Sequence, residues 1–298
     1  MEQIPVIIDC DPGADDSLGI LLALYSQKLS VLGITAVCGN APAAQTALNA
    51  TKVLRLAGQK EIQVYCGAEQ PLKRSLEFST KYSGADGLCE TGLSESPELL
   101  SDISATEYLI KSLKHTETPI TIIATAGFTN LAAALQRDPS IKNGIKEIVA
   151  AAGYYGINQK ECRAEWNIEV DPEAADLVFT SGIPIRAIGL DVTCMLEDTY
   201  TEQVLDGSTG EIADFFRKCD AYNRRTGLSS YSLLVDGMAA AAVIDPEIAR
   251  YHTGWVKVNP NQKGADLMNF TIAEGNVKAA YQYDMSRYIE MIKGMIRG

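Results

Sequence analysis

Apolar runs of β-like residues alternate with helix-like segments through most of this chain. The runs with the length and continuous hydrophobicity of buried strands are residues 4–8, 31–37, 62–66, 120–125, 148–152 and 183–188. The helix-like segments are residues 18–25, 43–57, 130–136 and 172–179. Continuous apolar strands separated by helices are typical of parallel sheets covered on both faces. The pattern therefore predicts a doubly wound, mostly parallel α/β sheet flanked by helices.

Two regions depart from this alternation. Residues 67–104 are rich in Ser, Gly and Pro, and we expect them to form a long functional loop that closes over a site. Residues 255–272 carry Asn259-Pro260-Asn261 between two β-like runs, which predicts a small β-hairpin before a terminal helix. Because no repeat or Pro/Gly-rich linker divides the sequence, we predict one domain spanning residues 1–298.

The acidic composition excludes several classes of partner. Lys and Arg number 26 against 38 Asp and Glu, so the formal net charge is −12. A negative balance of this size argues against nucleic acid or an anionic membrane surface as a partner. The chain starts without the basic residues of a signal peptide, and no apolar stretch approaches the length of a membrane span. Seven cysteines without a C-x-x-C pair indicate reduced thiols, so we predict a cytoplasmic protein.

Four aspartates lie within eight residues, in the segment Asp9-Cys10-Asp11-Pro12-Gly13-Ala14-Asp15-Asp16. Like charges at such spacing repel strongly unless a cation lies among them. The segment joins the first predicted strand to the first predicted helix, which is where open α/β sheets bind their ligands. An EF-hand loop does not fit, because its twelfth position would be Ile20 instead of Glu. The cluster therefore predicts a site for a hard cation such as Ca²⁺ or Mg²⁺.

Further polar residues follow other predicted strands or interrupt apolar segments. Asn40 follows the second run, Asn130 follows the run that ends at residue 125, and Glu165 and Asn167 follow the run at 148–152 after a loop. Asp236 interrupts an apolar segment at the expected start of a helix. In a doubly wound sheet these positions converge on the carboxyl edge. Together they suit a cation and a polyhydroxyl ligand.

The ordered motifs of this chain resemble those of the inosine-uridine-preferring nucleoside hydrolase family. Residues 9–17 fit the opening signature D-[TC]-D-P-G-x-D-D-[AS] at every place. The further matching motifs are Val37-Cys38-Gly39-Asn40, Thr129-Asn130-Leu131-Ala132, Ala164-Glu165-Trp166-Asn167 with Asp171-Pro172-Glu173-Ala174-Ala175, and Val235-Asp236. The resemblance covers essentially the whole chain and implies the Rossmann-like fold of that family, with a nucleoside substrate and a homodimer or homotetramer.

The resemblance also implies a metal centre and a reaction. Ca²⁺ would be held by Asp11, Asp16, Asp236 and the backbone carbonyl of Thr129. Asp11 would be the general base for a metal-bound water that attacks the ribose C1′, so that a ribonucleoside or related N-riboside is hydrolysed to free base and ribose. Asp9 would lie behind these residues and fix the loop.

The ribose contacts are likewise implied by the resemblance. Asp15, Asn40, Glu165 and Asn167 would hold the ribose hydroxyls. The residue that holds the 5′-hydroxyl would lie in Ile157-Asn158-Gln159, where Asn158 is the best chemical fit.

The leaving-group side departs from the family pattern. Many members have a histidine at the positions of Val235 and Ser83, and a general acid contributes about 10²–10⁴-fold to such a reaction. The candidates for a base pocket are Tyr82, Ser83, Tyr222, Asn223, Arg225, Tyr231 and Val235, with Arg224 and Trp166 as further neighbours.

Two other hypotheses fit parts of the sequence. A catalytically impaired ribose- or nucleoside-binding protein would keep the sugar and metal residues and lack the histidines. A haloacid-dehalogenase-type phosphatase also begins with a strand followed by D-x-D. That family has Thr or Val two residues after the second Asp, where this chain has Gly13, and it lacks the pair Asp15 and Asp16.

Overall fold

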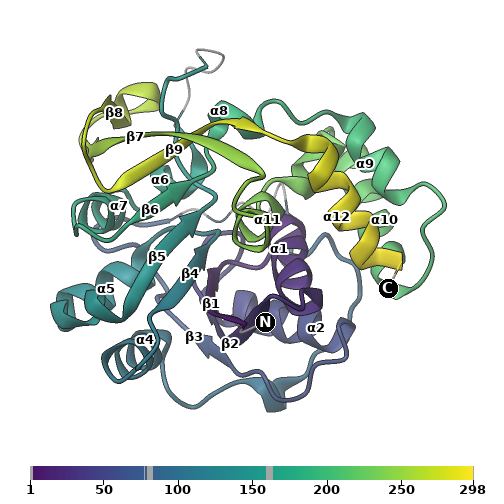
Figure 1. The fold of residues 1–298 in the computed structure, drawn as a ribbon. Coiled ribbons are helices and arrows are strands. Elements are labelled where there is room, and N and C mark those ends of the chain that lie inside the picture. The colour runs from purple at the N-terminus through teal and green to yellow at the C-terminus, as the bar shows by residue number, and fades with distance from the viewer. Residues whose placement is uncertain (1–2, 77, 79–82, 159–163, 298) are drawn as a thin grey trace.

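A single nine-stranded sheet forms the centre of the protein, and the computed structural model describes residues 3–76, 78, 83–158 and 164–297 of it. The strands are β1 Ile4–Cys10, β2 Leu29–Ala36, β3 Val64–Cys66, β4 Ile120–Ala124, β5 Ile145–Ala150, β6 Ile185–Ala187, β7 Ala249–Val258, β8 Met268–Ile272 and β9 Val277–Tyr283. Their order across the sheet is β3-β2-β1-β4-β5-β6-β9-β7-β8 (Figure 1).

Helices cover both faces of this sheet (Figure 1). The α-helices are α1 Ala14–Tyr25, α2 Ala43–Leu56, α4 Ala105–Lys114, α5 Thr129–Arg137, α6 Trp166–Val170, α7 Pro172–Phe179, α8 Leu190–Thr193, α9 Asp198–Leu205, α10 Glu211–Thr226, α11 Gly237–Ile244 and α12 Met285–Arg297. The 3₁₀ helices are η1 Pro97–Leu99, η2 Pro139–Gly144, η3 Ser230–Leu234 and η4 Gly264–Leu267. Among the described residues, no helix combines the length and hydrophobicity needed to cross a membrane.

Alternate residues of the central strands enter two separate hydrophobic clusters. Ile8 of β1 belongs to one cluster, which includes residues of α1, α2, α11 and α12, whereas its neighbour Ile7 belongs to the other, which includes residues of α4, α5 and α7. Successive side chains of a strand point to opposite faces, so the two clusters lie on the two faces of the sheet. This burial on both faces explains the continuous apolar runs in the sequence.

The parallel strands place the aspartate segment at a topological switch point. β1 pairs in parallel with β2 on one side and with β4 on the other, and β5 and β6 continue the parallel order beyond β4. The chain leaves β1 toward β2 and later returns to β4, so the carboxyl end of β1 borders the crevice typical of doubly wound sheets. The predicted doubly wound, mostly parallel fold is confirmed.

The predicted hairpin is present, but it belongs to the main sheet. β7 and β8 pair antiparallel, with Val256 opposite Phe270. β9, which the sequence pattern did not predict, pairs in parallel with β6 and antiparallel with β7. β9 therefore fastens the hairpin to the central sheet.

The terminal helix supports the segment that precedes Asp236. Tyr288 of α12 is fully buried and donates a hydrogen bond from its hydroxyl to the Leu234 carbonyl at 2.6 Å. Leu234 ends η3, two residues before Asp236. The helix α12 thus anchors the residues that lead into Asp236, one of the predicted metal ligands.

We expect Tyr288→Phe to lower the free energy of unfolding by about 1–2 kcal/mol, because it leaves a buried carbonyl without its donor. Tyr25→Phe is the matched control, since Tyr25 is 44% exposed and its replacement should change stability by less than about 0.5 kcal/mol. Urea denaturation measures both. Equal stabilities of the two variants would contradict the role of the Tyr288 hydroxyl.

Candidate active site

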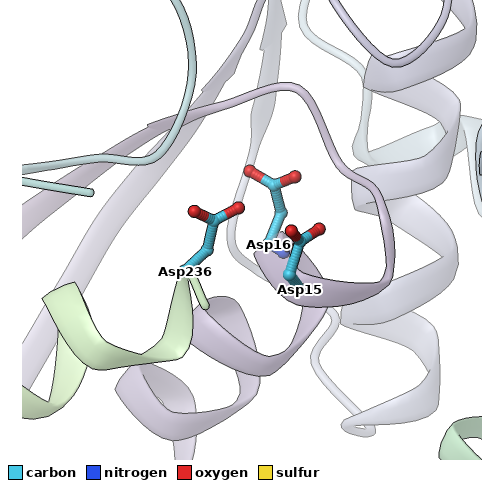
Figure 2. Close-up of side chains that lie close together, drawn as sticks. All are labelled: Asp15, Asp16 and Asp236. Carbon is cyan, nitrogen blue, oxygen red and sulfur yellow. Dashed lines mark hydrogen bonds between the residues drawn. The ribbon is translucent and has the colours of Figure 1, made fainter. Parts of the chain in front are cut away.

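Three carboxylates converge above the carboxyl edge of the sheet. Asp15 and Asp16 lie in the first turn of α1, and Asp236 is the residue directly before α11 (Figure 2). One carboxylate oxygen from each lies within 4.8 Å of the others. This spacing allows one cation to contact all three side chains.

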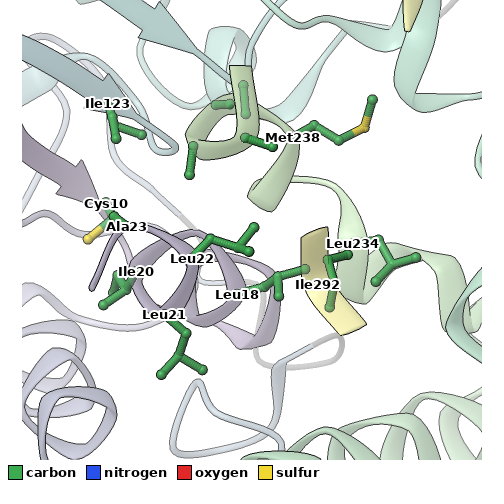
Figure 3. Packing of buried hydrophobic residues seen from close by; sticks show 14 of the residues in the cluster. Cys10, Leu18, Ile20, Leu21, Leu22, Ala23, Ile123, Leu234, Met238 and Ile292 are labelled. Carbon is green, nitrogen blue, oxygen red and sulfur yellow. The ribbon is translucent and has the colours of Figure 1, made fainter. Parts of the chain in front are cut away.

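The packing of α1 against α11 holds these carboxylates together. A Cβ placed on Gly19 would lie 3.5 Å from the backbone oxygen of Asp236, so the two helices approach closely at this point. Below it, Leu18, Leu22 and Met238 belong to the same buried hydrophobic cluster (Figure 3). The three carboxylates therefore lie at the N-terminal ends of α1 and α11, which pack into the same hydrophobic cluster.

Asp11 is joined to Asp16 through Asn40. The Asn40 backbone N–H donates to Asp11 Oδ2 at 2.7 Å. Its side-chain amide donates to the Asp11 carbonyl at 3.0 Å and to Asp16 Oδ2 at 3.4 Å. A Cβ on Gly39 would overlap the Asp11 carboxylate, so a glycine is needed before Asn40. The predicted residues Asp11, Asp16 and Asn40 are thus brought together.

Thr125 is a member of this site that the sequence interpretation missed. Its hydroxyl donates to Asp16 Oδ1 at 2.6 Å, and the Gly13 N–H donates to Asp16 Oδ2 at 3.0 Å. Thr129 is the residue whose backbone carbonyl was predicted to bind the ion. Its hydroxyl donates to Asp171 Oδ2 at 2.7 Å and not to a predicted metal ligand. Thr125 could have been proposed from the sequence, because it is a polar residue that directly follows the apolar strand β4, as the other site residues follow theirs.

Asp9 is buried behind the other aspartates. Its Oδ1 accepts hydrogen bonds from Thr35 Oγ1 at 2.6 Å and Asn130 Nδ2 at 2.9 Å. Its Oδ2 is buried without a hydrogen-bond partner among the described residues. Asp9 therefore connects β1 to β2 and to the start of α5.

Burial and mutual repulsion keep the carboxylates from ionising at their ordinary pKa. Burial, then the charge of Asp16, raises the pKa of Asp11 well above its ordinary value and that of Asp15 to about 7. Burial, then the charges of Asp15 and Asp16, raises the pKa of Asp236 well above its ordinary value. Burial also raises the pKa of Asp16. A hard cation would neutralise this repulsion, and the all-oxygen donor set fits such an ion.

Glu165 and Asn167 stand at the same edge of the sheet. Glu165 accepts hydrogen bonds from the backbone N–H groups of Gly153 at 2.9 Å and Asn167 at 2.9 Å, and it caps α6. Asn167 Nδ2 donates to the Thr125 carbonyl at 3.1 Å and the Ala151 carbonyl at 2.8 Å. These bonds place both residues at the ends of β4 and β5.

Asn158 is tied to the body of the protein. Its amide Nδ2 donates to the carbonyls of Asp191 at 2.7 Å and Tyr281 at 3.1 Å. Asp191 in turn accepts the backbone N–H groups of Tyr155 at 2.7 Å and Ile157 at 2.6 Å. The amide nitrogen of Asn158 is thus engaged in anchoring its own loop. Gln159 lies outside the described residues.

The base-pocket candidates do not form one group in the structure. Tyr82 lies outside the described residues. Ser83 joins the site, because its hydroxyl donates to the Asn40 carbonyl at 3.2 Å, and Val235 directly precedes Asp236. Tyr222 and Arg225 form a second group on α10, where the Arg225 guanidinium lies 5.1 Å from the Tyr222 ring centroid.

Two further candidates make contacts that stabilise the fold. Asn223 Nδ2 donates to Ser232 Oγ at 2.9 Å, which fastens α10 to η3. The backbone N–H of Tyr231 donates to Asp198 Oδ1 at 2.9 Å, which fastens η3 to the start of α9.

The chain matches one protein family along nearly its whole length. The family model described as inosine-uridine preferring nucleoside hydrolase matches residues 6–290. The chain is 32% identical over 303 residues to the pyrimidine-specific ribonucleoside hydrolase RihA of Shewanella woodyi, covering 97% of this chain and 96% of that protein. It is 35% identical over 284 residues to RihA of Citrobacter koseri, covering 92% and 90%.

Solved structures of similar proteins cover the whole fold. The plant nucleoside hydrolase PpNRh1 matches with a TM-score of 0.89 and 29% identity over 100% of both chains. The purine-preferring ribonucleoside hydrolase from Gardnerella vaginalis matches with a TM-score of 0.86 and 29% identity, covering 98% of this chain and 99% of that one.

The ion-free protein should lose stability as the pH rises from about 4 to about 7. Burial raises the pKa of Asp9 to about 6 and, with the charge of Asp16, that of Asp15 to about 7, from an ordinary value of 3.8. In this window the unfolded chain releases protons that the folded chain keeps, so the free energy of unfolding falls as pH rises. Asp9 alone contributes about 3 kcal/mol to this loss, at about 1.4 kcal/mol per pKa unit.

Thermal denaturation of EDTA-treated protein across this pH range measures the effect. Added Ca²⁺ should raise the Tm most at pH 7, where the carboxylates would otherwise repel each other. A Tm of the ion-free protein that stays constant or rises between pH 4 and 7 would contradict the prediction.

Proposed function

This chain belongs to the inosine-uridine preferring nucleoside hydrolase family and is an N-glycosyl hydrolase, and we propose that it uses Ca²⁺ to release the base and ribose of a ribonucleoside or related N-riboside. The observation that carries the proposal is the convergence of the Asp15, Asp16 and Asp236 carboxylates on one point, with their pKa values raised. The family match across residues 6–290 sets aside the haloacid-dehalogenase hypothesis.

We assign the cation to Asp11, Asp16, Asp236 and one backbone carbonyl. Asp15 lies close enough to Asp16 and Asp236 to reach the same ion, but we assign it to the ribose. Asp11 is assigned to the ion because Asn40 bonds both Asp11 and Asp16.

Thr125 suits the carbonyl position better than Thr129, because it directly follows β4 at the site and its hydroxyl is bonded to Asp16. Thr129 begins α5, where carbonyls point along the helix and accept intrahelical bonds. When bound, Ca²⁺ would lower the pKa of a coordinated water.

The remaining residues act on the sugar. Asp11 would take the proton of the water that attacks C1′. The ribose hydroxyls would be held by Asp15, Asn40, Glu165 and Asn167. The 5′-hydroxyl would be held by Asn158. The transition state resembles an oxocarbenium ion, so carboxylates around the ring stabilise it more than the neutral substrate.

The leaving group requires contacts outside the aspartate segment. Ser83 and Val235 stand at the positions where the family resemblance leads us to expect histidine, and neither can protonate a departing base as an imidazolium does. The relatives named above include both pyrimidine-specific and purine-preferring enzymes. The proposed substrate class is therefore the ribonucleosides as a group. The expected cytoplasmic location and homodimer or homotetramer stay predictions.

We expect the protein with Ca²⁺ to cleave p-nitrophenyl riboside, whose leaving group needs no proton. Asp11→Asn should abolish this activity, with a loss of at least about 10²-fold, because it removes the general base. Release of p-nitrophenolate measures both rates. A wild-type protein that binds Ca²⁺ but shows no turnover would support the binding-protein hypothesis and contradict the proposed hydrolysis.

Thr125→Val should weaken Ca²⁺ binding by about 10-fold, because loss of a bond that orients a ligand carboxylate typically costs 10–100-fold in metal affinity. Thr129→Val is the matched control, since its hydroxyl is bonded to Asp171 and not to a proposed ligand. Calcium titration of the two variants after EDTA treatment gives their affinities. An equal or larger loss in Thr129→Val than in Thr125→Val would contradict the role of the Thr125 hydroxyl in orienting Asp16.

A further inference from the structure

A strap of residues 83–96 runs between α2 and α10. On the side of α2, the Ser96 N–H donates to Thr51 Oγ1 at 3.2 Å. On the side of α10, Lys218 Nζ donates to the Thr91 carbonyl at 3.0 Å, and Arg225 pairs with Glu90 at 3.4 Å. The strap is therefore held by both helices.

The strap carries one of the base-pocket candidates, Ser83, and contacts a second, Arg225. It begins at Ser83, which bonds the Asn40 carbonyl, and it reaches Arg225, which lies over the Tyr222 ring, through Glu90. The aspartate segment, in contrast, supplies the residues proposed to act on the sugar. We therefore expect the base and the sugar of the substrate to be bound by two different segments of the chain.

Asn49 of α2 links these two segments. Its side chain is fully buried, and Nδ2 donates to the Pro12 carbonyl at 3.2 Å and to the Asp86 carbonyl at 2.8 Å. Pro12 belongs to the aspartate segment and Asp86 to the strap. One amide group therefore holds both segments at once.

The orientation of this amide is fixed by its surroundings. Asn49 Oδ1 accepts hydrogen bonds from Gln45 Nε2 at 3.0 Å and from Lys52 Nζ at 3.1 Å. Two donors face the oxygen and two carbonyls face the nitrogen, so all four hydrogen-bonding positions of the side chain are used. Lys52 is itself 7% exposed and also lies 3.7 Å from Glu95 of the strap.

Close packing at Gly87 leaves the strap little freedom. A Cβ on Gly87 would lie 2.9 Å from Ala41 Cβ and 3.2 Å from Asn49 Nδ2, and its φ of +71° favours glycine. Ala41 directly follows Asn40. The strap therefore rests on the segment that carries Asn40.

We propose that Asn49 is a positioning residue that sets the strap against the aspartate segment and thereby controls how the enzyme binds the base of its substrate. This inference rests on the proposed hydrolysis of ribonucleosides. Loss of the Asn49 amide would let the strap move while Asp11, Asp16 and Asp236 keep their own contacts. Binding of the base should then weaken more than binding of the sugar.

The test compares two kinds of competitive inhibitor, the free sugar and whole nucleosides, in p-nitrophenyl riboside hydrolysis by the Ca²⁺-loaded enzyme. Ribose reports on the sugar half of the site, and inosine and uridine report on both halves. Asn49→Ala should raise the inhibition constant of the better nucleoside by about tenfold, the effect of losing a few modest hydrogen-bonded contacts. The inhibition constant of ribose should change by less than about twofold, because its contacts remain.

Gly87→Ala is the second variant, and Gln45→Ala is the matched control. Gly87→Ala displaces the strap without altering Asn49 chemically, so it should reproduce the selective loss for the nucleoside. Gln45→Ala removes one bond to Asn49 Oδ1 and leaves both Nδ2 bonds, so both inhibition constants should stay near the wild-type values.

Parallel losses for ribose and nucleoside in Asn49→Ala and Gly87→Ala would overturn the inference, since they would show a general structural effect. Unchanged constants in both variants, or a wild-type enzyme that no nucleoside inhibits, would overturn it as well. Failure of the wild type to hydrolyse p-nitrophenyl riboside is a separate result, which contradicts the proposed function itself.

Discussion

The repulsion among buried carboxylates is the constraint on which the rest of this structure depends. Asp11, Asp16 and Asp236 are each at most 6% exposed, and burial raises the pKa of each. Such groups would separate or stay protonated unless the fold held them and a cation balanced their charge. The cluster is therefore a site that costs stability when empty and gains it when an ion binds.

The fold meets this constraint by placing each carboxylate on a rigid support. The first turn of α1 and the start of α11 face each other over a shared core, and Asn40 and Thr125 at the ends of β2 and β4 hold Asp11 and Asp16 by hydrogen bonds. On the side that we propose for the base, residues 83–96 are held by polar contacts to α2 and α10.

Much of this architecture could be predicted from the sequence, because strands buried on both faces leave continuous apolar runs. β9 escaped prediction, since Lys278 and Gln282 interrupt its apolar pattern and its pairing with β6 and β7 is long-range. Thr125 was assigned to the end of a strand, and only the fold shows that its hydroxyl meets Asp16. The anchoring of Asn158 likewise depends on partners that are distant in sequence, such as Tyr281.

The central claim is that the carboxylate cluster holds one cation. Calorimetric titration of the EDTA-treated protein with Ca²⁺ at pH 7 tests it most directly, with Asp16→Asn measured beside the wild type. The account predicts saturable binding of one ion per chain in the wild type and strongly weakened binding in the variant. Absence of binding in the wild type, or equal binding in both proteins, would contradict it.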